Sequence, residues 1–325
     1  MIDVNLHDVL VAHKRIAGSV FNTPLLYSDK MSELRGAQVW MKMESAQRTG
    51  SFKIRGASNR LLALTPAERQ RGVITTSSGN FALGLGMAAR TAKVDAIVVV
   101  PTSTPETKLE SIRRLGVQLV IHGANYDIAY AHAKEIALDT GRTYVSSYAD
   151  PWVVAGQGTV ALEAFLAEPD FDLLLVPVGG GGLLSGVAMV AKSLKPGVKV
   201  IGVQTEASAP WLHSFRQRRI VEVEYGETLA DGLLGEAGAA NLGMVLRYVD
   251  DILVVKESEV AEAMHWMIKY QHQIIEGSAA VGVAALLHHL PELGGLKVLN
   301  IVTGSNVDAS RIAKILHSVE MAAAC

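Results

Sequence analysis

Short runs of apolar, β-branched residues recur along the chain, and a segment with helical spacing follows each of them. Residues 73–76 precede a helical segment from about 80 to 91, and residues 96–100 precede one at 104–115. Residues 117–121 precede 126–140 in the same way. The series continues with apolar runs at 173–178, 198–203, 252–255 and 298–303. Near-continuous apolar strands that alternate with helices predict parallel β-sheet covered by helices on both faces, an α/β fold.

One helix start is predicted residue by residue. Thr104 suits the N-cap of the helix at 104–115, and Pro105 suits its first turn, where no backbone N–H is needed. Glu106 adds a favourable negative charge at the positive end of the helix dipole. We therefore expect the helix to begin at Pro105.

The length and composition of the chain indicate two lobes with well-packed interiors. A chain of 325 residues is long for a single core. Hydrophobic residues make up 49% and charged residues 19%, the opposite of the balance found in disordered chains. No internal repeat and no linker rich in Pro, Gly or Ser divides the chain. The two lobes are therefore expected to be interleaved rather than arranged in series.

Charge and cysteine content exclude several classes of function. The formal net charge is −2 and no long basic run is present, which argues against a nucleic-acid partner. The single cysteine, Cys325, excludes an intrachain disulfide and fits a reducing compartment. The first residues lack the apolar segment of a signal peptide, and no stretch approaches the ~20 apolar residues of a membrane span. A cytoplasmic protein without a membrane partner is expected.

Three of the predicted strands end in turns rich in glycine, hydroxyl or amide residues. These turns are residues 77–80, 179–182 and 303–306. Ligands of open α/β sheets bind at the carboxyl ends of the strands. We therefore expect the three turns to be walls of one cleft.

The turn Gly179-Gly180-Gly181-Gly182 lies between a strand and a helix and favours phosphate binding. Consecutive glycines allow backbone N–H groups to converge at a helix N-terminus. No Gly-Lys-Ser/Thr follows, so the turn is not a P-loop. The nearest dinucleotide-type pattern, at 84–86, lies inside a helix. A plain flexible turn is the alternative interpretation.

Lys53 is a candidate nucleophile. It follows a Gly-Ser turn at a predicted helix start and is flanked by Phe52 and Ile54. Apolar surroundings lower the pKa of a lysine amine and make it nucleophilic. The alternative is an ordinary solvated lysine.

The other candidates are polar residues at helix starts and strand ends. Residues 77–80 suit a carboxylate, although an ordinary Ser/Asn helix cap has the same composition. Glu276 precedes an apolar helix, where a first-turn acid is also explained by the helix dipole alone. Thr303 ends the last strand, and its alternative is a plain turn. The ten histidines show no spacing typical of metal ligands.

Taken in order, these motifs resemble those of the serine/threonine dehydratase and serine racemase family of fold-type II pyridoxal-phosphate enzymes. The matching segments are 51–57, 77–80, 155–159, 177–182, 230–232, 276–284 and 304–308. The resemblance covers nearly the whole chain. It implies two interleaved open parallel-sheet domains: a large cofactor-binding domain of residues 1–62 and 151–325, and a small domain of residues 63–150 that closes over the substrate. It also implies a homodimer or homotetramer.

The resemblance implies pyridoxal 5′-phosphate as cofactor and Lys53 as the lysine that forms a Schiff base with it. Lys53 and Ser78 are the expected catalytic residues, with Ser78 serving as acid/base on the face opposite Lys53. The expected cofactor-binding residues are Phe52, Lys53, Asn80, Gly179, Gly180, Gly181, Gly182, Leu183, Glu276 and Thr303. The expected substrate-binding residues are Ser77, Ser78, Asn80, Phe81 and Tyr148. Thr303 is expected to face the pyridine nitrogen, where a hydroxyl favours early loss of a β-substituent.

The chain departs from the family pattern at three places. Phe81 stands where the family commonly has histidine, and residues 146–148 read Ser-Ser-Tyr instead of His-Pro-Phe. Both changes lie where the resemblance places the substrate side chain, so the identity of the substrate stays undetermined. Gln204 stands where many members have a glutamate that helps to bind a divalent cation, so no metal site is expected. The chain ends soon after Asp308, and no C-terminal regulatory domain is expected.

The sequence therefore predicts β-elimination from a small β-hydroxy amino acid, which yields a 2-oxo acid and ammonia. Threonine, serine, 3-hydroxyaspartate and phenylserine are the candidate substrates. An amino-acid racemase with Lys53 and Ser78 as its two bases is the alternative. A binding module with the same fold but no chemistry is a further alternative, against which the intact Lys53 motif argues.

Overall fold

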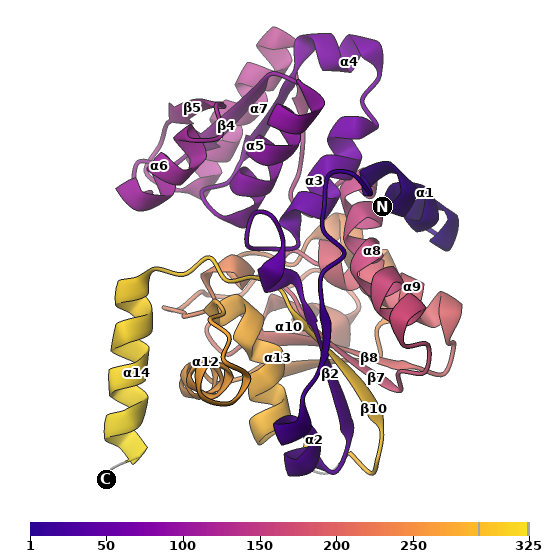
Figure 1. The fold of residues 1–325 in the computed structure, drawn as a ribbon. Coiled ribbons are helices and arrows are strands. Elements are labelled where there is room, and N and C mark those ends of the chain that lie inside the picture. Colours follow the sequence, from indigo (N-terminus) through magenta and orange to yellow (C-terminus); the bar gives the residue numbers. More distant parts are fainter. Residues whose placement is uncertain (292, 324–325) are drawn as a thin grey trace.

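The strands of the computed structural model, which describes residues 1–291 and 293–323, form two separate sheets (Figure 1). The larger sheet has the order β1-β2-β10-β7-β8-β9, and only β1 is antiparallel to its neighbour. Its strands are β1 (Leu25–Tyr27), β2 (Gln38–Met43), β7 (Leu173–Pro177), β8 (Lys199–Thr205), β9 (Asp251–Val255) and β10 (Lys297–Val302). The smaller, fully parallel sheet has the order β5-β4-β3-β6. Its strands are β3 (Val73–Thr76), β4 (Ala96–Val100), β5 (Gln118–Ile121) and β6 (Thr143–Tyr144).

Fourteen α-helices connect and cover the strands of the described chain. They are α1 (Leu6–Ile16), α2 (Asp29–Arg35), α3 (Lys53–Leu62), α4 (Pro66–Arg71), α5 (Asn80–Ala92), α6 (Glu106–Arg113), α7 (Tyr126–Thr140), α8 (Pro151–Ala167), α9 (Gly182–Leu194), α10 (Pro210–Gln217), α11 (Leu242–Tyr248), α12 (Glu257–Gln271), α13 (Gly277–His288) and α14 (Ala309–Ala323). Three short 3-10 helices, η1 (Glu44–Ala46), η2 (Asp231–Leu233) and η3 (Ala239–Asn241), lie in connecting segments. Each of these helices falls short of the length and apolarity that a membrane crossing needs.

Both sheets are covered on both faces, as the apolar strands predict. In β7, Leu174 and Val176 face the core formed with α1, α8, α9 and α11, whereas Leu173 and Leu175 face the core formed with α12 and α13. In the smaller sheet, one face packs against α3, α5 and α6 and the other against α7. The predicted α/β fold with two parallel sheets is confirmed.

The seven predicted strands are all present, within three residues at either end. The three strands that the pattern did not indicate, β1, β2 and β6, are short or lie near a sheet edge. The chain forms β1 and β2 of the larger sheet, then the whole smaller sheet, and then returns to the larger one. The sheets are therefore interleaved along the chain, whereas the domain boundaries at 62/63 and 150/151 stay a prediction. Cys325 lies outside the described residues.

The predicted start of α6 is wrong. The helix begins at Glu106, and Pro105 is its N-cap, with an extended ψ of 143° and no side-chain cap. The carbonyl oxygen of Pro105 accepts the first helical hydrogen bonds, from the N–H groups of Lys108 and Leu109. The proline ring fixes φ but leaves ψ free, so Pro105 ends the preceding turn and Thr104 is left outside the helix.

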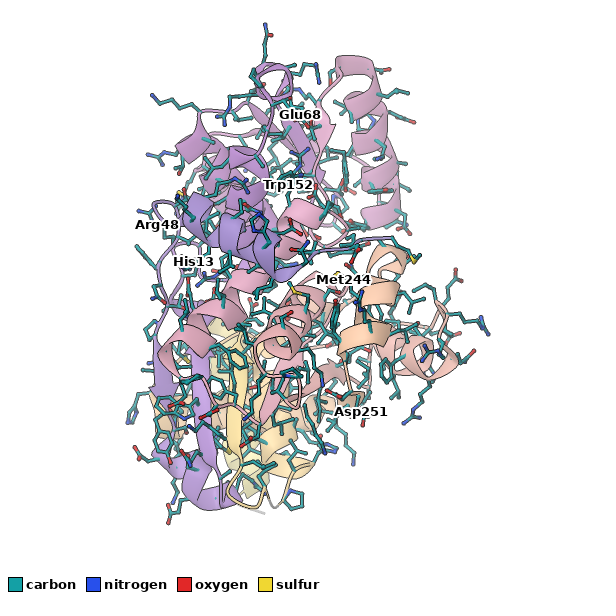
Figure 2. The ribbon with its side chains drawn as sticks, turned by 90° about the vertical axis from the view of Figure 1, so that its right-hand side faces the viewer. His13, Arg48, Glu68, Trp152, Met244 and Asp251 are labelled. Carbon is teal, nitrogen blue, oxygen red and sulfur yellow. The ribbon has the colours of Figure 1, made fainter. Side chains whose placement is uncertain are left out.

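Helix α3 lies where the two lobes meet. It packs against α5 of the smaller-sheet lobe and against α8. A Cβ atom on Gly84 of α5 would lie 2.9 Å from the backbone nitrogen of Ile54, so only glycine permits this close approach. Figure 2 shows Trp152, at the start of α8, between Glu68 of the upper lobe and Asp251 of the lower one. Because α3 packs against both lobes, its first residue, Lys53, lies at their junction.

A fully buried set of four charged side chains attaches α3 to its neighbours. Arg55 donates from Nε to Glu44 Oε2 and from Nη1 to Glu163 Oε1, both at 2.7 Å. Lys42 Nζ donates to Glu163 Oε2, also at 2.7 Å. The four side chains are at most 3% exposed. Burial opposes the charge on Arg55, but Glu44 and Glu163 outweigh it and raise the pKa of the guanidinium.

Replacing Arg55 by methionine is expected to lower the free energy of unfolding by about 3–5 kcal/mol, because two carboxylates are then left buried without their shared cation. Urea denaturation followed by circular dichroism measures the loss. Arg114→Met is the matched control, since Arg114 is 79% exposed and, among the described residues, pairs only with Glu110. No measurable change is expected there. An equally small effect of both substitutions would show that the buried charges do not hold α3.

Candidate active site

A cavity lies at the carboxyl ends of the parallel strands, between the two lobes. The three turns predicted to meet there do so: Ser77, Gly79 and Asn80, the four glycines 179–182, and Thr303 all line it. Every residue predicted to bind cofactor or substrate lines this cavity except Ser78. Ser78 is half-buried between Ser77 and Gly79, which both line the cavity.

Lys53 is the first residue of α3, and its side chain reaches the cavity. The amine Nζ lies 3.4 Å from the carbonyl oxygen of Ser147 and 5.1 Å from the ring centroid of Phe52. Desolvation lowers the pKa of this amine from 10.5 to about 8, against the attraction of Glu276. A lysine amine in this state supplies a neutral nucleophile or base near neutral pH.

The glycine loop forms the opposite wall of the cavity. Gly181, the N-cap of α9, has a φ of +92°, which a residue with a side chain rarely adopts. No side chain caps α9, so the first N–H groups of this helix are left for another acceptor. The arrangement suits a phosphate group.

Thr303 and the loop fit pyridoxal phosphate. The hydroxyl of Thr303 is buried at the cavity wall and has no hydrogen-bond partner among the described residues. A buried hydroxyl of this kind would satisfy the pyridine nitrogen of the cofactor, the glycine loop would hold its phosphate, and Lys53 would bind its aldehyde carbon. The groups that line the cavity therefore match the pyridine nitrogen, the phosphate and the aldehyde of this cofactor.

Asn80 joins the two lobes at the edge of the cavity. Its Nδ2 donates to Glu276 Oε1 at 2.7 Å, and its Oδ1 accepts from Asn306 Nδ2 at 2.6 Å. Burial and then the nearby Asp231 raise the pKa of Glu276 to about 8, although the Asn80 bond opposes this. These bonds fix the orientation of the Asn80 amide and leave one Nδ2 hydrogen for a ligand.

Phe81 and Tyr148 give the cavity an aromatic side. Phe81 is buried, and the Tyr148 ring lies directly over Gly180. The Tyr148 hydroxyl donates to Glu236 Oε1 at 3.4 Å. Burial, followed by the charge of Glu236, raises the pKa of Tyr148. This phenol is therefore neutral at physiological pH.

Gln204 is part of the internal packing of the larger lobe. Its Nε2 donates to the carbonyl oxygen of Val178 at 3.2 Å, and its Oε1 accepts from the backbone N–H of Trp211 at 2.9 Å. Within the described chain, no three His, Cys, Asp or Glu side chains are grouped so that they could hold a metal ion. That the activity needs no divalent cation stays a prediction.

Several lining residues were not singled out from the sequence. Ser147 contributes a main-chain carbonyl, which no side-chain pattern reveals. Gly232 and Ser278 lie in segments that matched the family, so their motifs carried a signal. Leu233 directly follows the segment 230–232, and no motif of its own marked it as a lining residue.

Comparison with known proteins agrees with this geometry. Residues 16–304 match the protein family described as pyridoxal-phosphate dependent enzymes. The chain is 41% identical to the L-threonine ammonia-lyase of Thermotoga maritima, over 97% of this chain and 78% of that protein. It is 36% identical to the catabolic L-threonine dehydratase of Escherichia coli and to the L-threo-3-hydroxyaspartate ammonia-lyase of Saccharomyces cerevisiae, in both cases over 98% of each chain.

Solved structures agree as well. Maize serine racemase superposes with a TM-score of 0.92 at 29% identity, over 99% of both chains. Threonine deaminase isoform 2 of Solanum lycopersicum superposes with a TM-score of 0.89 at 30% identity, over 98% of this chain and 96% of that one. The chain therefore belongs to the family of pyridoxal-phosphate dependent enzymes, with the fold of its fold-type II members.

Proposed function

We propose that this pyridoxal-phosphate-dependent ammonia-lyase acts on a small neutral β-hydroxy amino acid such as threonine or serine. The reaction removes the β-hydroxyl and the amino group and releases a 2-oxo acid and ammonia. The names of the relatives leave the substrate open, because threonine and 3-hydroxyaspartate lyases are similarly related to this chain. The observation that carries the choice is the charge of the cavity wall.

The wall offers a place for one carboxylate. Helix α5 begins at Asn80 with no side-chain cap, and Ser77 and Asn80 line the cavity beside it. Backbone N–H groups at this helix N-terminus and the Asn80 amide are suitable donors to the α-carboxylate of the substrate.

A second carboxylate on the substrate lacks a partner. Of the described residues that line the cavity, Lys53 alone is basic, and it is needed for the chemistry. The other side chains that line the cavity include Phe81, Tyr148 and Leu233, which are apolar or neutral. Burying an unpaired carboxylate against these groups is costly. The cavity therefore favours a neutral side chain over that of 3-hydroxyaspartate.

The residues of the chain carry the proton movements and the orientation. When bound, pyridoxal phosphate withdraws electrons from Cα of the amino acid and makes its α-proton acidic. Lys53 has the position and the lowered pKa to take and hold that proton. The glycine loop would hold the phosphate, Phe52 packs beside Lys53, and the Thr303 hydroxyl would hydrogen-bond to the ring nitrogen. Tyr148 and Phe81 limit access of water.

Ammonia release from a panel of amino acids tests the substrate. Threonine or serine is expected to exceed 3-hydroxyaspartate in kcat/KM by at least about tenfold, which corresponds to ~1.4 kcal/mol of transition-state discrimination. Phenylserine reports whether the aromatic side of the cavity accepts a larger group. Leu233→Arg supplies the missing cation and is expected to reduce the difference in kcat/KM between threonine or serine and 3-hydroxyaspartate. Leu233→Met is the control and should leave this difference unchanged. A wild-type preference for 3-hydroxyaspartate would show that the proposed substrate class is wrong.

The pH dependence of cofactor attachment tests Lys53. Because burial lowers the pKa of its amine, the neutral fraction rises through a pH of about 8 instead of 10.5. At pH 7 this fraction is roughly 300-fold larger than for an ordinary lysine. Attachment of pyridoxal phosphate to the apoprotein, trapped with borohydride, should therefore accelerate with a midpoint near pH 8. Peptide mapping should find the label on Lys53, and Lys53→Ala should abolish it. A label on another lysine would contradict the assignment.

The racemase alternative requires a second base opposite Lys53, and we propose Ser78 for this role. Ser78→Ala is then expected to lower racemisation by at least ~100-fold, the usual effect of losing a general acid/base. Ammonia release should fall by about tenfold or less, the effect of one neutral hydrogen bond. Both rates are followed in one preparation, with Ser77→Ala as the control that should lower both alike. If racemisation and ammonia release fall by the same small factor in Ser78→Ala, Ser78 does not act as a base.

The remaining expectations concern the context of the enzyme. A homodimer or homotetramer and a cytoplasmic location stay predictions.

A further inference from the structure

Three successive carbonyl groups at the start of the glycine loop each accept a hydrogen bond from a different side chain. Gln204 Nε2 donates to the oxygen of Val178 at 3.2 Å. Trp211 Nε1 donates to the oxygen of Gly179 at 2.6 Å, and Asn241 Nδ2 donates to the oxygen of Gly180 at 2.8 Å. A regular succession of this kind constrains every peptide plane from Val178 to Gly181.

The three donors form a connected, buried support behind the loop. Gln204, Trp211 and Asn241 each have no exposed surface, and none of them lines the cavity. They come from β8, α10 and η3, which are separated along the chain. Gln204 Oε1 also accepts from the backbone N–H of Trp211, so two of the donors are held together. Asn241 additionally donates to the oxygen of Tyr148 at 3.1 Å.

Fixing a carbonyl also fixes the next N–H group. The peptide unit is planar and trans, so the N–H of each residue points opposite to the preceding C=O. Bonds to the oxygens of residues 178–180 therefore set the N–H directions of Gly179, Gly180 and Gly181. Without them, a run of glycines samples many conformations, and ordering it on binding costs conformational entropy. A loop held in place beforehand binds an anion more tightly.

We propose that Gln204, Trp211 and Asn241 are positioning residues for the cofactor phosphate. They act through the backbone of the glycine loop and touch neither cofactor nor substrate. Gln204 thus serves the glycine loop at a position where many members of the family have a glutamate that helps to bind a divalent cation. The inference concerns cofactor binding and is independent of which amino acid the enzyme converts.

The decisive measurement compares two cofactor forms on the apoprotein. Pyridoxal reacts with Lys53 as pyridoxal phosphate does, but it has no phosphate for the loop to hold. Trp211→Phe removes the Nε1–H and keeps most of the aromatic volume. In this variant, the Kd for pyridoxal phosphate is expected to rise about three- to tenfold, the range for one lost hydrogen bond. The Kd for pyridoxal is expected to change less than about twofold, because pyridoxal has no phosphate. Inorganic phosphate should compete less well with pyridoxal phosphate in the variant.

Trp40→Phe is the matched control. The Nε1–H of Trp40, on β2, is buried and bonds to no described residue, so its removal should leave both dissociation constants unchanged. Asn241→Ser provides a second test at another carbonyl, with the same expected loss of phosphate selectivity. The thermal midpoint of each apoprotein shows whether it is folded.

Two outcomes would overturn the proposal. In the first, both cofactor forms lose affinity by the same factor in Trp211→Phe and Asn241→Ser, which is the effect of a general distortion of the cavity. In the second, neither form loses affinity. If Trp211→Phe fails to fold, the ratio of the two dissociation constants in Asn241→Ser decides.

Discussion

The position of the reactive lysine depends on the buried charges around Arg55. Two positive and two negative side chains meet where no water is available to solvate them, so each is tolerable only while the others stay in place. Arg55 lies two residues after Lys53; its carboxylate partners come from η1 and α8, and Lys42 of β2 shares the α8 carboxylate. The geometry that satisfies the charges therefore also sets where α3 begins. A wrongly placed α3 leaves unpaired charge in the core, which excludes alternative packings of this junction.

The lobes have different tasks around that junction. The larger lobe supplies the glycine loop, Thr303 and Glu276, which line the cavity where the cofactor would bind. The smaller lobe supplies Ser77, Gly79, Asn80 and Phe81, which line the cavity as well. Asn80 carries hydrogen bonds from one lobe to the other. Burial, followed by the nearby Asp231, raises the pKa of Glu276, so the Asn80 bond between the lobes ends on a carboxyl group whose charge is disfavoured.

Most of the sheet architecture could be predicted, because buried parallel strands are continuous apolar runs. The start of α6 could not be predicted, since proline fixes φ and leaves ψ to the tertiary context. The location of the cavity could be predicted where a local motif marks it, as with Lys53 after its Gly-Ser turn and the four consecutive glycines 179–182, all of which line the cavity. Trp211 and Asn241 gave no signal, because their contribution is a bond to a carbonyl far away in sequence. The contact of the Ser147 carbonyl with Lys53 and the buried partners of Arg55 cannot be recognised in the sequence, because they depend on the folded chain.

The two consecutive carbonyls of Ser147 and Tyr148 connect the two ends of the cofactor site. Ser147 accepts from Lys53, and Tyr148 accepts from Asn241, which also holds Gly180. A displacement of this dipeptide therefore reaches the amine and the phosphate loop together. Through this one short segment, Lys53 at the start of α3 and the glycine loop before α9 are tied to each other, although they lie far apart in the sequence.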